Sequence, residues 1–105
     1  MNKLIVVTGG TKGIGRAIIE KFASVGFDIV TCARNSHDLG EMKDALDRQY
    51  RSIKVVTHPT DMSDKKQVKS FCSAVLDLGR PVDVLVNNAG YFAPGEITTE
   101  PEGAL

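Results

Sequence analysis

A glycine-rich stretch near the N-terminus has the composition of a phosphate-binding turn. Residues 8–15 read Thr-Gly-Gly-Thr-Lys-Gly-Ile-Gly; they follow an apolar run at residues 4–7 and lead into a segment with helical periodicity. Glycines at this spacing let the backbone turn tightly and let a ligand approach it closely. The first N–H groups and the dipole of the following helix then favour an anion in the turn. We interpret the stretch as a site for the pyrophosphate of a dinucleotide.

The elements that must position this turn can be read from the hydrophobic pattern. Four short apolar runs, each expected to form a buried strand, alternate with helical patterns; they cover residues 4–7, 27–33, 53–58 and 82–86. Such alternation predicts an α/β fold with a parallel sheet and helices on both faces. A doubly wound layout gives the strand order 3-2-1-4, with the topological switch between the first and fourth strands. Residues 8–15 and 87–90 then lie at the carboxyl ends of those two strands, where open α/β sheets bind ligands.

The helical patterns also make detailed predictions. Asn35 or Ser36 is expected to cap the second helix, and Ser63 is expected to cap the third, with Asp64 in its first turn. The apolar face of the first helix is expected to contain Ile14, Ala17, Ile18, Phe22 and Val25.

Three motifs stand at the ends of the first, third and fourth predicted strands. They are Thr8-Gly9-x-x-x-Gly13-Ile14-Gly15, Asp61, and Asn87-Asn88-Ala89-Gly90. Together they resemble the classical short-chain dehydrogenase/reductase family, and the resemblance covers the whole chain. It implies a Rossmann-like domain over residues 1–105 whose loops hold NAD or NADP. It also implies that hydride passes between the nicotinamide and a carbonyl or alcohol.

The resemblance assigns roles to individual residues. In the family, the aspartate that matches Asp61 meets the adenine amino group, with the backbone of the next residue alongside; the alternative is an acid that merely flanks a helix. Residues 87–90 would shape the central wall of the cofactor site, although Asn and Gly after a strand also make an ordinary turn. The cofactor-binding residues expected from the motifs are Thr8, Gly9, Thr11, Lys12, Gly13, Ile14, Gly15, Arg34, Asn35, Asp61, Met62, Asn87, Ala89 and Gly90.

The choice between the two cofactors can be argued from charge. An acid at the end of the second strand would favour NAD, but this strand ends in Ala33 and Arg34. The planar guanidinium of Arg34 can pair with a 2′-phosphate, and Lys12 adds a second positive charge in the glycine turn. We therefore expect NADP rather than NAD. The alternatives are a solvated loop arginine and an ordinary surface lysine.

Catalytic residues are not expected within this sequence. The spacing of Tyr50 and Lys54 imitates the Tyr-x-x-x-Lys pair of the family. That pair belongs on one helical face, whereas here Tyr50 would end a helix and Lys54 would lie in a strand. The catalytic serine, tyrosine and lysine of the family lie beyond the region that this chain resembles, so no catalytic role is assigned.

Composition limits the remaining possibilities. The chain has 105 residues, which allows at most one small domain, and 13 basic and 13 acidic residues give no net charge. This balance argues against nucleic acid or an anionic membrane as a partner. Cys32 and Cys72 are expected to be buried, reduced thiols, and no spacing of His and Cys suggests a metal site. Without a signal or membrane-spanning segment, a soluble cytoplasmic protein is expected.

The leading hypothesis is the N-terminal, cofactor-binding half of an NADP-dependent oxidoreductase that acts on a small carbonyl or alcohol. Residues 98–102 look like a helix start, so the chain is expected to be truncated within a larger domain that forms a homo-oligomer when complete. Two alternatives remain open. One is a non-catalytic nucleotide-binding or interaction module that pairs through its fourth strand; the other is a fragment without a function of its own.

Overall fold

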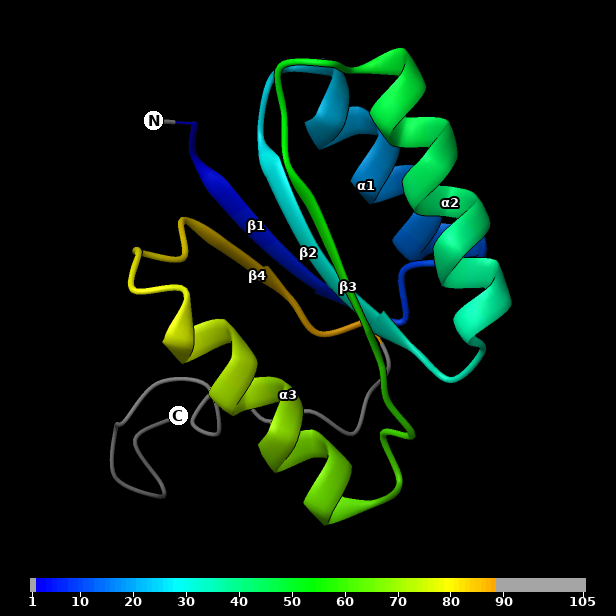
Figure 1. Cartoon of the computed structure of the whole chain (residues 1–105), viewed down its shortest axis with the longest axis vertical. Coiled ribbons are helices and arrows are strands. Elements are labelled where there is room, and N and C mark those ends of the chain that lie inside the picture. The colour runs from blue at the N-terminus through cyan, green and yellow to red at the C-terminus, as the bar shows by residue number, and fades with distance from the viewer. Residues whose placement is uncertain (1, 89–105) are drawn as a thin grey trace.

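A four-stranded parallel sheet forms the centre of the computed structural model, which describes residues 2–88 (Figure 1). The strands are β1 (Leu4–Thr8), β2 (Asp28–Ala33), β3 (Val55–Pro59) and β4 (Val84–Val86). Their spatial order is β3-β2-β1-β4, which confirms the predicted order. β1 lies between β2 and β4, so both of its faces and both of its edges are covered, and all five of its residues are buried. This explains why its sequence is a continuous apolar run rather than an alternating one.

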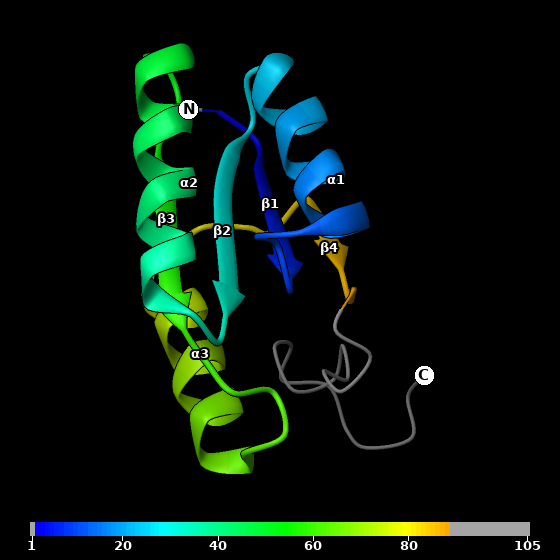
Figure 2. The ribbon, with the colours of Figure 1, turned by 90° about the vertical axis from the view of Figure 1, so that its right-hand side faces the viewer.

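Three helices cover the two faces of the sheet. The helices α1 (Gly13–Ser24) and α2 (Ser36–Gln49) lie together on one face, and α3 (Lys65–Asp77) lies on the other (Figure 2). Each face has its own hydrophobic core, because alternate residues of β1 point to opposite sides. Ile5 and Val7 pack under α1 and α2, whereas Leu4 and Val6 pack against α3. The predicted arrangement of helices on both faces is therefore confirmed.

The most buried positions of α1 are each one residue further along the helix than the predicted Ile14, Ile18 and Phe22. Gly15, Ile19 and Ala23 are the buried residues, whereas Ile14 is 72% exposed and Val25 is 60% exposed. The reason is close packing at the start of the helix. Gly15 lies against the Gly9 carbonyl, where no side chain fits, and this contact fixes which side of α1 faces the sheet. Ile18 and Phe22 of the predicted face do pack, partly buried, against this core, so the prediction was right for them and wrong for Ile14 and Val25. Glycine and alanine carry little hydrophobic signal, so the pattern missed the most buried positions.

The caps of the other two helices agree only in part with the sequence pattern. The Asn35 side chain caps α2 by accepting hydrogen bonds from two backbone N–H groups of its first turn, as predicted. The predicted cap of α3 was wrong, because Asp64 rather than Ser63 accepts the bond from Lys66 N–H at 2.9 Å. The Ser63 hydroxyl instead donates to Asp61 at 2.7 Å. Either residue type suits a cap, and the choice followed from this competing partner.

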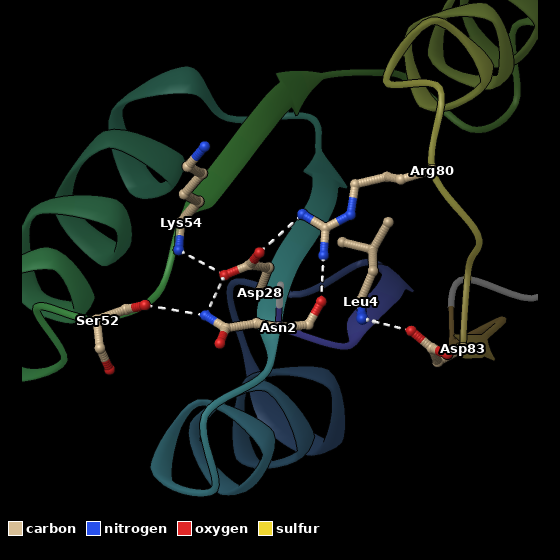
Figure 3. Close-up of polar contacts among 7 residues, drawn as sticks. All are labelled: Asn2, Leu4, Asp28, Ser52, Lys54, Arg80 and Asp83. Atoms are coloured by element: carbon tan, nitrogen blue, oxygen red, sulfur yellow. Dashed lines mark hydrogen bonds and ion pairs between the residues drawn. The ribbon is translucent and has the colours of Figure 1, made fainter.

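A polar cluster lies at the end of the sheet where the four strands begin (Figure 3). Asp28, at the start of β2, accepts hydrogen bonds from the Asn2 side chain, from the Lys54 backbone N–H and from Arg80. Arg80 lies in the connection between α3 and β4, where Asp83 also accepts a bond from the Leu4 N–H at 2.8 Å. These contacts join the starts of all four strands at one edge. The loops that contain the motifs lie at the opposite end of the sheet, where the strands finish.

Candidate functional site

The loops at the carboxyl ends of β1, β2 and β3 enclose a pocket of about 360 Å³. Three segments far apart in the sequence form it: the glycine turn after β1, the β2–α2 connection, and the loop that follows β3. Its lining includes many of the predicted site residues, together with four that were not among them, Ala33, Asp38, Thr60 and Ser63. The complete lining is Gly9, Thr11, Lys12, Ala33, Arg34, Asn35, Asp38, Thr60, Asp61, Met62 and Ser63.

The backbone of the glycine turn explains two of its glycines. Gly13 has a φ of +58°, a conformation that other residues adopt with strain, although no atom would crowd a side chain there. Gly15 has the opposite reason: a methyl group would collide with the Gly9 carbonyl and lie 2.8 Å from the Asn88 amide nitrogen. The turn is tied to the neighbouring strand by a hydrogen bond of 2.9 Å from Gly9 N–H to the Cys32 carbonyl. The conformation of the turn is thus fixed by its contact with the start of α1 and by its hydrogen bond to β2.

The start of α1 is the part of this turn that can receive an anion. Lys12 occupies the cap position, and its side chain makes no capping hydrogen bond to the first turn of α1. In α2 and α3, by contrast, Asn35 and Asp64 accept such bonds. The first N–H groups of a helix have no partner within the helix, and its dipole is positive at this end. Among the described helices, α1 is therefore the one whose cap residue makes no side-chain bond to these N–H groups.

Two cations border the pocket on the side of α2. The Lys12 side chain is 83% exposed, and its Nζ lies 3.8 Å from a carboxylate oxygen of Asp38. Arg34 follows directly after β2 and is exposed. Its charge acts on Asp61 across the pocket, where it contributes to the lowered pKa of that carboxyl. The end of β2 thus presents a positive charge where folds that bind NAD present an acid.

Asp61 and Met62 form the wall opposite Arg34. Hydrogen bonds from the side chain and backbone of Ser63 hold the pKa of Asp61 below its usual value, and the charge of Arg34 acts in the same direction. Both bonds reach Oδ1, at 2.7 and 3.0 Å, and no hydrogen bond within residues 2–88 reaches Oδ2. That oxygen can therefore accept a bond from a ligand. Met62 is buried beside Asp61, with its sulfur 3.6 Å from the thiol of Cys32.

The end of β4 is joined to the glycine turn by two asparagines. Thr8 donates to the Asn87 side chain at 3.3 Å, and the Asn88 amide donates to the Gly9 carbonyl at 3.1 Å. Asn88 was absent from the predicted site residues, although its place beside Asn87 in the motif was the signal that could have found it. The predicted residues Ala89 and Gly90 lie outside the described part of the chain. Asn87 and Asn88 act here by fixing the turn against the adjacent strand.

The other predictions for the site can be placed as follows. Ile14 does not line the pocket but projects from the start of α1. Tyr50 is the C-cap of α2 and Lys54 precedes β3, so the two do not share a helical face, as expected.

Cys32 and Cys72 are both buried thiols, and burial raises the pKa of Cys32 to about 11. Across residues 2–88, no group of His, Cys, Asp and Glu side chains could hold a metal ion. No helix in the same range is long and apolar enough to cross a membrane.

Comparison with known proteins identifies the family. The sequence model that describes the short chain dehydrogenases matches residues 3–103. This chain belongs to the short chain dehydrogenase family. It is 39% identical over 101 residues to a short chain dehydrogenase of Pseudocercospora fijiensis, and the match covers 95% of this chain and 32% of that protein.

Solved structures of short chain dehydrogenases share the fold. The L-sorbose reductase of Gluconobacter frateurii, complexed with NADPH and L-sorbose, is 35% identical with a TM-score of 0.78. An alcohol dehydrogenase of Thermococcus sibiricus, complexed with 5-hydroxy-NADP, is 30% identical with a TM-score of 0.75. The matches cover 85% and 81% of this chain, but 34% and 36% of those chains. The chain thus spans about a third of the length of each of these three relatives.

Proposed function

We propose that the pocket binds NADP(H), and that the chain is the cofactor-binding part of an oxidoreductase acting on a small carbonyl or alcohol. The observation that carries the proposal is the charge of the rim: Lys12 and Arg34 both border the pocket, and no acid ends β2. A 2′-phosphate is the feature that distinguishes NADP from NAD, and two cations at this position suit it. Relatives complexed with NADPH or an NADP derivative support the same choice.

The described residues suit the parts of a dinucleotide in turn. The uncapped start of α1 and the glycine turn suit the pyrophosphate, because they offer N–H groups at a positive helix end. The remaining oxygen of Asp61, with the buried Met62 beside it, suits the adenine. Asn87 and Asn88 hold the turn in place from the end of β4.

The chemistry divides between the cofactor and the protein. When bound, NADP(H) supplies or accepts the hydride. The described residues bind and orient it, and the fixed turn aligns its phosphates with the start of α1. In our proposal the proton donor and the substrate pocket come from elsewhere in the full protein, since Tyr50 and Lys54 do not form a helical pair. This division accounts for a well-formed cofactor pocket without an assigned catalytic residue.

Cofactor titration of an Arg34→Asp variant tests the proposal. In the protein as its gene encodes it, we expect calorimetry to show NADPH binding weakened at least about tenfold, because a charge-assisted hydrogen bond is worth about 1.5–3 kcal/mol. Binding of NADH should improve, since an acid at this position can accept from the ribose hydroxyls.

The matched control is Arg51→Asp, which makes the same charge change in the exposed turn between α2 and β3. This turn lies at the opposite edge of the sheet from the pocket. If both variants kept the cofactor preference of the original protein, the role of Arg34 would be refuted. If the original protein bound neither nucleotide, the proposed function itself would fail.

A further inference from the structure

Asp38 is an acid at the very place where the proposed function needs positive charge. It lies in the first turn of α2, and its side chain is 30% exposed. One carboxylate oxygen lies 3.8 Å from Nζ of Lys12. Asp38 borders the 360 Å³ pocket and also a neighbouring hollow of about 500 Å³ between α1 and α2. It therefore stands between the two helices, beside the lysine that would meet a phosphate.

The two acids of the pocket differ in what holds them. Ser63 fixes the Asp61 carboxylate with two hydrogen bonds from its own loop. Within the part of the chain that the structure describes, Lys12 is the only ion-pair or hydrogen-bond partner of the Asp38 carboxylate. Asp38 is also not the cap of its helix, because Asn35 has that role and accepts from the Asp38 N–H. The position of the Asp38 carboxylate is therefore not explained by a local hydrogen bond or by helix capping.

The Lys12–Asp38 contact is also loose. At 3.8 Å it is far longer than the Lys43–Asp47 pair further along α2, which measures 2.6 Å. An exposed pair of this length contributes little to stability, so an incoming anion can displace it readily. When the pocket is empty, however, Asp38 neutralises part of the charge that would attract a phosphate. We therefore expect the Lys12–Asp38 pair to change the affinity for a phosphate more than the stability of the fold.

We propose that Asp38 is a specificity-determining residue whose carboxylate serves as an internal counter-anion for Lys12 and opposes the 2′-phosphate. The inference rests on the proposed binding of NADP(H). Both nucleotides carry the pyrophosphate, so its repulsion by Asp38 cancels when their affinities are compared. Only NADPH adds a 2′-phosphate, a group with close to two negative charges near pH 7. Asp38 thus narrows the preference for NADPH that Lys12 and Arg34 create.

An Asp38→Asn variant of the protein as its gene encodes it provides the test, with NADPH and NADH titrated by calorimetry. We expect NADPH to bind about two- to fivefold more tightly, the range that an exposed charge pair supports. NADH should change much less, so that the affinity ratio rises. The gain should shrink at high salt, because exposed charges are screened, and should also shrink in a Lys12→Met background. A general structural effect of the variant would shift both nucleotides together.

The matched control is Asp47→Asn, which removes a 41% exposed acid from the same helix that lines neither the pocket nor the neighbouring hollow. It should leave the affinity ratio unchanged. An unchanged ratio for Asp38→Asn, or a gain that persists in full without Lys12, would overturn the inference while leaving NADPH binding intact. A selective loss of NADH binding would overturn it too, because Asp38 would then accept from the ribose hydroxyls. Absence of binding by the unmodified protein would instead refute the proposed function, and this inference with it.

Discussion

The ion pair between Asp28 and Arg80 offers a sharp test of what holds this sheet together (Figure 3). Asp28 uses both carboxylate oxygens: Oδ2 accepts from Arg80 at 2.7 Å, and Oδ1 accepts from Asn2 and from the Lys54 N–H. An Asp28→Asn substitution keeps the shape of the side chain but leaves one acceptor oxygen and adds an NH₂ group. Whichever way the amide turns, a donor faces a donor.

The expected cost follows from burial. The Asp28 and Arg80 side chains are only 6% and 15% exposed. Removing one partner of a buried ion pair costs about 3–5 kcal/mol, because the other charge stays buried without compensation. The amide oxygen can still serve the Lys54 N–H, so we expect the lower end, about 3 kcal/mol. In a domain of this size that loss lowers the melting temperature by roughly 12 °C or more.

Urea unfolding followed by circular dichroism measures this cost, and Asp47→Asn is the matched control. The Lys43–Asp47 pair is equally short, at 2.6 Å, but both of its side chains are 41% exposed. Its loss should cost less than about 0.5 kcal/mol, since water compensates exposed charges. If the two variants lost similar stability, burial would not be what makes the Asp28 pair strong, and the reasoning would be refuted.

Three further predictions concern acid stability, the glycine turn and thiol reactivity. Burial raises the pKa of Asp28, but hydrogen bonds from Asn2, the Lys54 N–H and Arg80, with the charge of Arg80, outweigh it and leave the pKa below 3.8. The stability from this carboxylate should therefore be complete above about pH 5 and be lost as the pH falls through the lowered pKa. Below pH 4 the urea midpoint of Asp28→Asn should thus fall less steeply with pH than that of the original protein. Parallel acid profiles of the two proteins would contradict this. Gly15→Ala should abolish measurable NADPH binding because its methyl group displaces the turn, whereas Gly40→Ala, in open space within α2, should stabilise the fold by about 0.5–1 kcal/mol; retained affinity in the first variant would show that the turn tolerates displacement. With its pKa near 11 and no exposure, Cys32 should react with a thiol reagent at pH 8 only after unfolding in urea, and equal rates in both states would refute its burial.

The sequence predicted the elements of this fold well because their signals are local. An apolar run that forms a strand buried on both faces is visible in the strand itself, as at residues 4–7. The strand order followed from the alternation of strands and helices and from the handedness of their connections. The polar residues at the strand ends then had to gather at one edge of the sheet. For this reason the pocket brings together residues such as Lys12, Arg34 and Asp61, although their roles as cofactor ligands stay predictions.

Details that depend on competition between neighbours were harder to predict. Ser63 and Asp64 are equally suitable caps by type, and the bond from Ser63 to Asp61 left the cap to Asp64. Asn88 reaches the Gly9 carbonyl only because β4 lies beside β1. Asp38 meets Lys12 only because the starts of α1 and α2 lie at the same end of the sheet. The last two contacts join groups that lie far apart in the sequence, so no local pattern predicts them.

The sequence by itself thus determined the order of strands and helices, the glycine turn and the family. These features rest on composition and spacing within short segments, and such segments fold in a similar way in many proteins. Tertiary structure alone decided which positions of α1 are most buried, the pairing of Asp28 with Arg80 across 52 positions, and the approach of Asp38 to Lys12. The physical reason is that packing chooses among faces and partners that are locally equivalent, and it does so through close contacts such as that of Gly15 with the Gly9 carbonyl.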